Sequence, residues 1–344
     1  MSLLVRRLLR SSSVRFHLGG RGRVFSNGFS SGSSAQSPPC YIMPSSACGE
    51  DLRKVIIFKA NEMVYTDVDK KVHGELLDDD EIITVGSSNG WVGTMKEDGI
   101  LVLQDDLNPF ASDSHPKRVP LPPLVTLPGC QTQVVTNVSM SSSSPEDENC
   151  VVAVKIKHQC FYSSRVMFSE KDDVFCLPGS GGYIIGSWDL KDPKNKPKIQ
   201  RLRFQNLPEL TKTKRELLHS CSTTEHLVES RSTGETFLIK WYRKATSSGA
   251  VKMKTRALMV FKLDEEGNAV YTRDIGDLCI FLSNSEPFCV PASSFHGLNS
   301  NHVRFLDLDE HGVVFLGHDG CLSPIRAYNK AYPAPYYIPP QSLD

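Results

Sequence analysis

The sequence predicts an all-β protein with the architecture of a β-propeller, preceded by an N-terminal segment without regular structure. Three observations lead to this prediction. Short apolar runs end in Gly, Asn or Asp turns and recur at roughly the 8–12-residue spacing of all-β domains. Only one short stretch between these runs, 208–219, has helical character, which argues against a parallel α/β sheet with helices between its strands. The strand-bearing region, 54–340, is too long for a single sandwich of ~100 residues, whereas small sheets repeated around an axis suit that length.

The N-terminal half of this region shows the strand pattern most clearly in three consecutive runs. Ile82–Val85 leads into the glycine-bounded turn 86–90, Trp91–Thr94 follows it, and Ile100–Leu103 forms the third run. Turn residues between alternating apolar runs indicate antiparallel hairpins. The other strands expected here are 55–58, 151–156, 164–168 and 173–176.

The C-terminal half repeats the pattern. The turn Ser232–Gly234 joins runs 225–230 and 235–241 and is a strong hairpin signal. Further strands are expected at 183–190, 257–263, 269–274, 279–282, 302–307 and 313–316. A short helix is expected at 208–219, and two segments, 108–123 and 139–148, are expected to be insertions. The three tryptophans, Trp91, Trp188 and Trp241, are expected to pack between sheets. The Pro- and Tyr-rich tail, 332–340, either closes the ring of sheets or recruits a partner.

The first 25 residues have the composition of an organellar presequence. They contain six arginines and no lysine or acid, and Arg6, Arg7 and Arg10 fall on one arc of a helical wheel. Their longest apolar run, Leu3–Val5, is too short for a secretory signal. Arg23–Ser26 resembles a mitochondrial processing site, so we expect mitochondrial import, with chloroplast import, dual targeting or a basic nucleic-acid-binding arm as alternatives.

Residues 26–53 are rich in Ser, Gly and Pro and are expected to form a flexible linker. The ten cysteines show neither C-x-x-C pairs nor zinc-ligand spacing to histidine, and are interpreted as reduced, mostly buried thiols. No run of apolar residues is long enough for a membrane span.

Charge is unevenly distributed along the chain. The 39 basic and 39 acidic residues balance, but removal of the six leader arginines leaves 33 against 39, a net charge of −6. Residues 191–256 nevertheless contain 16 basic and 6 acidic residues, a local charge of +10. Such polarity is typical of an electrostatically oriented docking face, although a solvated lysine-rich loop would look the same. The candidate interaction loop comprises Lys191, Lys194, Lys196 and Lys198.

The C-terminal half also resembles a known family. Phe261–Gly267, Asp274–Leu282, Phe288–Val290 and Phe295–Leu298 look like hallmarks of plant F-box-associated proteins, whose propeller was catalogued as a domain of unknown function, number two-nine-five. The resemblance implies a kelch-like β-propeller used for protein binding, often as the substrate receptor of a ubiquitin ligase. Residues 26–53 contain no F-box, and the presequence resembles an organellar branch of that family.

Motifs for catalysis or cofactor binding are not found. Gly179–Gly182 lacks the P-loop pattern and precedes a strand. Asp307–Gly312 opens like a calcium loop, but His311 stands where a third Asp or Asn is needed and no Glu follows six residues after Gly312. No G-x-S-x-G or H-E-x-x-H occurs. We therefore assign no catalytic, metal or cofactor residue and no small-molecule substrate.

The sequence thus predicts a non-enzymatic, mitochondrially imported β-propeller that binds a protein partner. One alternative is an organellar RNA-binding protein, because Phe204, Trp241 and Tyr242 accompany the basic span and could stack on bases. An F-box-like substrate-recognition protein and a cryptic propeller enzyme are further alternatives.

Overall fold

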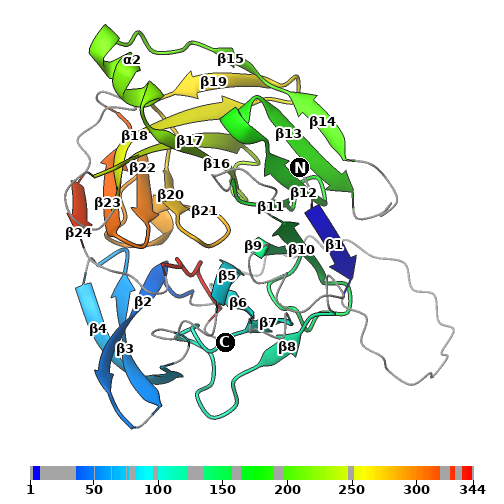
Figure 1. Ribbon diagram of the computed structural model, residues 1–344, viewed down its shortest axis with the longest axis vertical. Coiled ribbons are helices and arrows are strands. Elements are labelled where there is room, and N and C mark those ends of the chain that lie inside the picture. The colour runs from blue at the N-terminus through cyan, green and yellow to red at the C-terminus, as the bar shows by residue number, and fades with distance from the viewer. Residues whose placement is uncertain are drawn as a thin grey trace, which may run out of the picture.

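The computed structural model describes residues 3–7, 36–49, 51–62, 64–74, 76, 83–95, 100–122, 135–156, 164–189, 197–246, 252–317, 326–329 and 335–342. In these residues small sheets are arranged around a central axis (Figure 1). The predicted all-β propeller is confirmed.

Three sheets come from the N-terminal half of the chain. The first contains β2 (Cys40–Ala47), β3 (Leu52–Lys59) and β4 (Val64–His73), and the second contains β5 (Ile83–Ser88), β6 (Trp91–Met95), β7 (Leu101–Gln104) and β8 (Arg118–Pro120). The third contains β9 (Val135–Met140), β10 (Val151–Ile156) and β1 (Leu3–Arg7), with β10 in the centre.

The other three sheets come from the C-terminal half. One contains β11 (Met167–Ser169), β12 (Val174–Pro178), β13 (Ile184–Asp189) and β14 (Lys198–Arg201). The next contains β16 (Ser222–Glu229), β17 (Thr236–Ala245), β18 (Met253–Leu263) and β19 (Asn268–Thr272), with β15 (Arg203–Gln205) parallel to β19. The last contains β20 (Leu278–Leu282), β21 (Phe288–Pro291), β22 (His302–Leu306), β23 (Glu310–Phe315) and β24 (Arg326–Asn329).

The hydrophobic core lies between adjacent sheets. Because successive side chains of a strand point to opposite faces, a strand covered on both sides needs an unbroken apolar run. β20, with the sequence Leu-Cys-Ile-Phe-Leu, is buried at every position. Its Ile280 packs with Trp241 and Val260 of the preceding sheet, whereas Phe281 packs with Tyr41 and Phe58 of the first sheet. Each sheet is thereby held by both of its neighbours.

The C-terminal tail closes the ring. The N–H of Ile338 donates to the carbonyl of Cys40 at 2.7 Å, and the N–H of Cys40 donates back to Ile338 at 3.2 Å. The N–H of Ser37 donates to the carbonyl of Gln341, which extends the pairing outward from β2. Tyr337 lies edge-on to the rings of Tyr41 and Phe281. Of the two roles expected for the tail, the structure supports ring closure.

The linker expected at 26–53 is wrong for its second half, since Cys40–Ala47 form β2 and Gln36 already bridges to Ser342. The short apolar run Tyr41–Met43 is fully buried, and the surrounding serines and prolines hid its strand character. The consecutive strands of the propeller therefore begin near residue 36 rather than 54, and β1 adds an edge strand to the third sheet. Residues 8–35 lie outside the described part of the chain, and the strand β1 within the leader was not predicted.

Both expected insertions also contain strand residues. β8 lies inside 108–123 as the edge strand of its sheet, where a proline is tolerated because one side of the strand makes no ladder bonds. Ser139 and Met140 belong to β9, and both are buried. The expected helix is present in shortened form as α2 (Lys212–His219), with Thr211 as its N-cap.

Several smaller expectations are confirmed. Ser230 and Glu235 close the hairpin between β16 and β17, with Gly234 at a positive φ of 69°. Trp91 and Trp241 are buried, and Trp188 is half-buried against the adjoining core. The described cysteines are free thiols, but fewer are buried than expected: Cys40, Cys150 and Cys279 are buried, and the other four described cysteines are half-buried.

Candidate interaction site at the mouth of the channel

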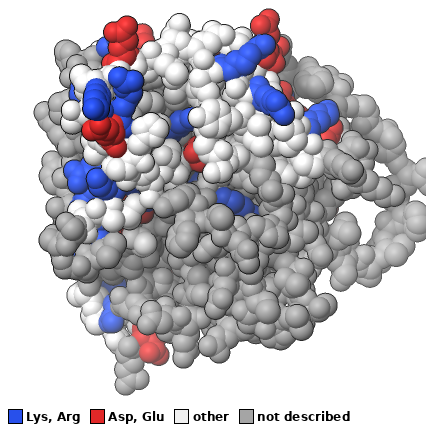
Figure 2. All heavy atoms as spheres, turned by 45° about the horizontal axis from the view of Figure 1, so that its top comes forward, with Lys and Arg blue, Asp and Glu red and all other residues white. Residues whose placement is uncertain are grey.

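The predicted interaction loop falls largely outside the described residues. Lys191, Lys194 and Lys196 are not described, and Lys198 opens β14 as an exposed side chain at a sheet edge. Over the described part of the face in Figure 2, Lys and Arg stand beside Asp and Glu rather than forming one continuous basic field. The interaction loop therefore stays a prediction.

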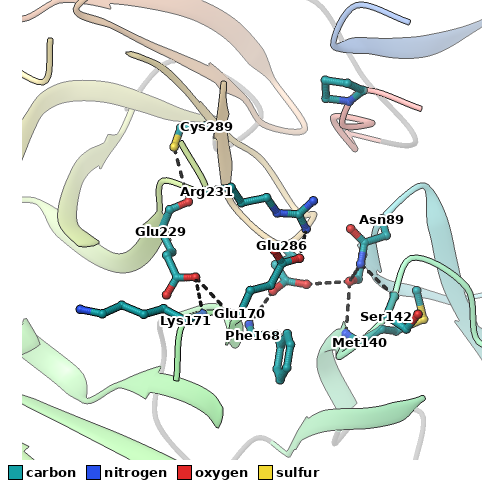
Figure 3. Close-up of polar contacts among 12 residues, drawn as sticks. Asn89, Met140, Ser142, Phe168, Glu170, Lys171, Glu229, Arg231, Glu286 and Cys289 are labelled. Atoms are coloured by element: carbon teal, nitrogen blue, oxygen red, sulfur yellow. Dashed lines mark hydrogen bonds and ion pairs between the residues drawn. The ribbon is translucent and has the colours of Figure 1, made fainter. Parts of the chain in front are cut away.

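A different site lies where the innermost strands end. The turn after β5 brings Asn89, the turn after β9 brings Ser142, the turn after β11 brings Glu170, and the turn after β16 brings Arg231. Together with the β20–β21 loop and the tail, these turns enclose a depression of about 680 Å³, here called the channel-mouth depression. Figure 3 shows its polar contacts.

Glu286, in the β20–β21 loop, is the central polar residue of this depression. Its carboxylate accepts a hydrogen bond from Ser88 Oγ at 2.6 Å and one from the backbone N–H of Phe168 at 2.7 Å. Its own N–H donates to the carbonyl of Ser87 at 2.6 Å. Ser88 Oγ also accepts the N–H of Met140. Glu286 thus joins the β20–β21 loop directly to β5 and β11, and Ser88 extends this network to β9 (Figure 3).

Burial raises the pKa of Glu286 to about 7, and the hydrogen bonds from Ser88 and Phe168 offset only part of that effect. A raised carboxyl pKa in a depression is a frequent feature of active sites. Here, however, both carboxylate oxygens hold structural donors, so the geometry assigns Glu286 to positioning the turns rather than to proton transfer.

Glu229, at the end of β16, organises the neighbouring turn in the same way. It accepts hydrogen bonds from Ser169 Oγ and from the N–H groups of Glu170 and Lys171, at 2.9 and 3.2 Å. Cys289 Sγ lies 3.5 Å from its carbonyl oxygen. The β11–β12 turn is thereby held against β16, and the side chain of Glu170 is left at the rim.

The rim also carries an exposed ion pair. Arg231 Nη2 lies 2.6 Å from Glu170 Oε1, and the two side chains are 70% and 49% exposed. Exposed pairs of this kind contribute at most about 1 kcal/mol to stability. Both charges can therefore exchange partners at little cost when another molecule approaches.

Two partly exposed aromatic rings, Phe168 and Phe288, belong to the lining of the depression. Phe288 is half-buried and stacks on the buried Phe281, with ring centroids 4.9 Å apart and an interplanar angle of 9°. Phe168 is half-buried against Phe175 at 5.1 Å. Each partly exposed ring is thus held in place from behind. Aromatic side chains surrounded by polar groups are a common feature of protein-binding surfaces.

A second depression, of about 850 Å³, lies between α2 and the sheet of β16–β19. Lys240 Nζ lies 4.2 Å from the ring centroid of Phe204 and 4.9 Å from that of Tyr183. Burial lowers the pKa of Lys240 and raises that of the adjacent Glu225 to about 6. Gly181, in the glycine-rich segment considered above as a phosphate loop, donates its N–H to Glu225 instead, so that segment supports a carboxylate.

Sequence reasoning missed both depressions. Glu286 and its donors Phe168 and Ser88 are separated by 118 and 198 residues, and only the fold brings them together. The described residues hold no cluster of three or more His, Cys, Asp or Glu side chains placed to bind a metal. Nor does the described part of the chain contain a helix with the length and apolarity needed to cross a bilayer.

Comparison with known proteins agrees with this architecture. The sequence profile described as KIB1-4 beta-propeller matches residues 63–321, well over half of the chain. No curated protein matches the sequence. The profile spans β4 to β23 and includes the turns that build the channel-mouth depression. The chain therefore belongs to the KIB1-4 beta-propeller family.

Proposed function

We propose that this protein is a non-enzymatic, mitochondrial β-propeller that binds a partner protein at the channel-mouth depression. The observation that supports it is the depression itself, in which turns from separate sheets surround two partly exposed aromatic rings. Loops held on a rigid scaffold are the usual carriers of binding specificity. The rings of Phe168 and Phe288 would receive apolar side chains of the partner, and Glu170 and Arg231 would pair with its charges.

The mitochondrial part of the proposal rests on residues 1–25, with their six arginines and lack of acids. Its finer family placement, a kelch-like and F-box-associated plant lineage, rests on the sequence motifs given above. In that lineage the propeller serves to hold another protein. Without an F-box in 26–53, this chain would use the same scaffold for binding alone.

The test is affinity purification of the tagged full-length protein from purified mitochondria, with partners compared between variants. Arg231→Glu reverses a rim charge, and we expect it to reduce partner recovery at least tenfold. Lys212→Glu, a similar reversal on an 88% exposed side chain of α2, is the matched control and should recover the partner normally.

A charge-swapped double variant separates recognition from loop folding. Arg231→Glu combined with Glu170→Arg rebuilds the ion pair with reversed polarity. If the partner reads the charge at position 231, binding stays lost in the double variant. Wild-type recovery with Arg231→Glu would contradict the proposed binding site.

A further inference from the structure

Arg165 is a cation in the channel without a carboxylate partner among the described residues. It lies just before β11, where Nη1 donates to the carbonyl of Thr136 at 3.0 Å and Nη2 donates to Asn284 Oδ1. Both acceptors are neutral. Its Nε is buried and has no hydrogen-bond partner in the described structure. A guanidinium has five N–H donors, so these two bonds leave most of its capacity unused.

The surroundings of Arg165 increase this excess of positive charge. Among the described residues, electrostatic interactions link Arg165 to two further cations, Lys155 and Arg243, and to the carboxylate Asp307. Lys155 also interacts with the carboxylate Glu225, so this group contains three cations and two carboxylates.

The two carboxylates are already engaged. Asp307 is ion-paired with Arg243, and Glu225 holds the N–H of Gly181 and interacts with Lys240. Burial, with Arg165 as the next cause, lowers the pKa of Lys155 to about 8, and burial lowers the pKa of Arg165 to about 10. Removal from solvent is the largest cause of both shifts, and repulsion between Arg165 and Lys155 adds to the shift of Lys155.

The charges of these cations also act on His226. Its Nε2 lies 3.1 Å from Thr224 Oγ1, whereas the buried Nδ1 has no hydrogen-bond partner among the described residues. Burial first, and then the charges of Arg165, Arg243 and Lys155, lower its pKa well below the usual value. The imidazole is therefore neutral at pH 7, which limits the repulsion in the channel.

A small cavity lies beside the guanidinium. It has a volume of about 210 Å³ and is lined by Thr84 and Val85 of β5, Val135 and Thr136 of β9, Arg165, Asn284 and Tyr336. Arg165 is only partly buried, so the cavity gives solvent access to it. Since one water takes up about 30 Å³ of liquid, this space can hold a group of several heavy atoms.

We propose that this cavity is a binding site for a small oxyanion, a phosphate or carboxylate group held by Arg165. The guanidinium fork matches the paired oxygens of such anions, and the bond is strengthened by charge. Thr84, Thr136 and Tyr336 contribute hydroxyl-bearing side chains to the lining. This site is separate from the channel-mouth depression and does not depend on the proposed partner binding.

The test is thermal unfolding of the full chain titrated with inorganic phosphate and, in a second arm, with malonate, both at constant ionic strength. A ligand that binds only the folded state raises the melting temperature with its concentration. We expect a saturable rise with at least one of the two anions, and none with chloride. The anion that binds more tightly distinguishes a phosphate from a carboxylate site.

Two variants assign the response to Arg165. Arg165→Met removes the charge at similar length and should weaken anion binding at least tenfold. Asn284→Asp replaces the amide oxygen that accepts from Arg165 Nη2 with a carboxylate oxygen. The protein itself then supplies the negative charge that would otherwise come from the bound anion. We expect this variant to melt at a higher temperature than wild type without anion and to lose the anion response.

Asn284→Asp keeps the test decisive if Arg165→Met fails to fold. An equal response to chloride, or an unchanged anion response in Asn284→Asp, would overturn the proposal. The proposal would also be overturned if the melting temperature of the wild type responded to neither anion, because the charge of Arg165 would then be balanced by another part of the chain.

Discussion

The pH dependence of stability gives a direct test of the structural role assigned to Glu286. In the folded protein its pKa is raised to about 7 by burial, against an ordinary value of 4.5. The folded state thus holds this proton more tightly than the unfolded state between these two values. The contribution is fully present below pH 4.5 and is lost as the pH rises through about 7.

The size of the effect follows from the shift in pKa. One pKa unit corresponds to about 1.4 kcal/mol, so the Glu286 contribution to the free energy of unfolding declines by roughly 2–3 kcal/mol between pH 5 and pH 8. Glu286→Gln retains an oxygen that can accept from the N–H of Phe168, and its amide can donate to Ser88 Oγ after the hydroxyl turns. The variant therefore keeps the contacts but does not titrate.

The assay is urea unfolding of wild type and Glu286→Gln at pH 5 and pH 8. The variant is expected to gain roughly 2–3 kcal/mol relative to wild type on going from pH 5 to pH 8. Other titrating groups, Glu225 included, occur in both proteins and cancel in the difference. Glu209→Gln, at an exposed carboxyl, should show no such gain. Parallel pH profiles for wild type and Glu286→Gln would refute the reasoning.

Three further predictions concern ring closure, the basic loop and import. In urea unfolding, Ile338→Ala should lower the free energy of unfolding by about 2–4 kcal/mol, because Ile338 is 3% exposed and packs on β2. The control Leu308→Ala, at a 53% exposed position, should change the free energy of unfolding by less than about 0.5 kcal/mol. Charge reversal at Lys194, Lys196 and Lys198 should weaken partner recovery from mitochondria and leave the melting temperature unchanged; unaltered recovery would remove this loop from the proposed interaction. The mature protein isolated from mitochondria should begin near Ser26 by mass spectrometry, and an intact Met1 terminus in that fraction would contradict removal of a presequence.

Local patterns were enough to predict the fold class. The hairpin 225–241 was predicted because two strand-forming runs flank a single turn with glycine, and the structure pairs Glu229 with Thr236 across it. β2 was missed because its apolar run, Tyr41–Met43, is short and its neighbours have the composition of a linker. The pairing of β15 with β19 joins segments about 65 residues apart in parallel, which no local signal specifies.

The candidate sites were less predictable for the same reason. The channel-mouth depression depends on turns from separate sheets, and Arg165 interacts with Asn284, 119 residues away. The sequence around a single charged residue after a strand does not predict which residues it contacts in the fold. Charge counting selected the basic loop of Lys191–Lys198. Arg165, whose buried Nε has no hydrogen-bond partner in the described structure, lies in a segment of ordinary composition.

The central claim, that this propeller binds a protein in mitochondria, is tested most directly by one purification. The tagged full-length protein is isolated from intact, purified mitochondria, and the extract is divided into RNase-treated and untreated halves. We expect the protein to be present in the organelle and the same stoichiometric protein partner to be recovered from both halves. Partners that disappear after RNase treatment, or absence of the protein from the organelle, would contradict it.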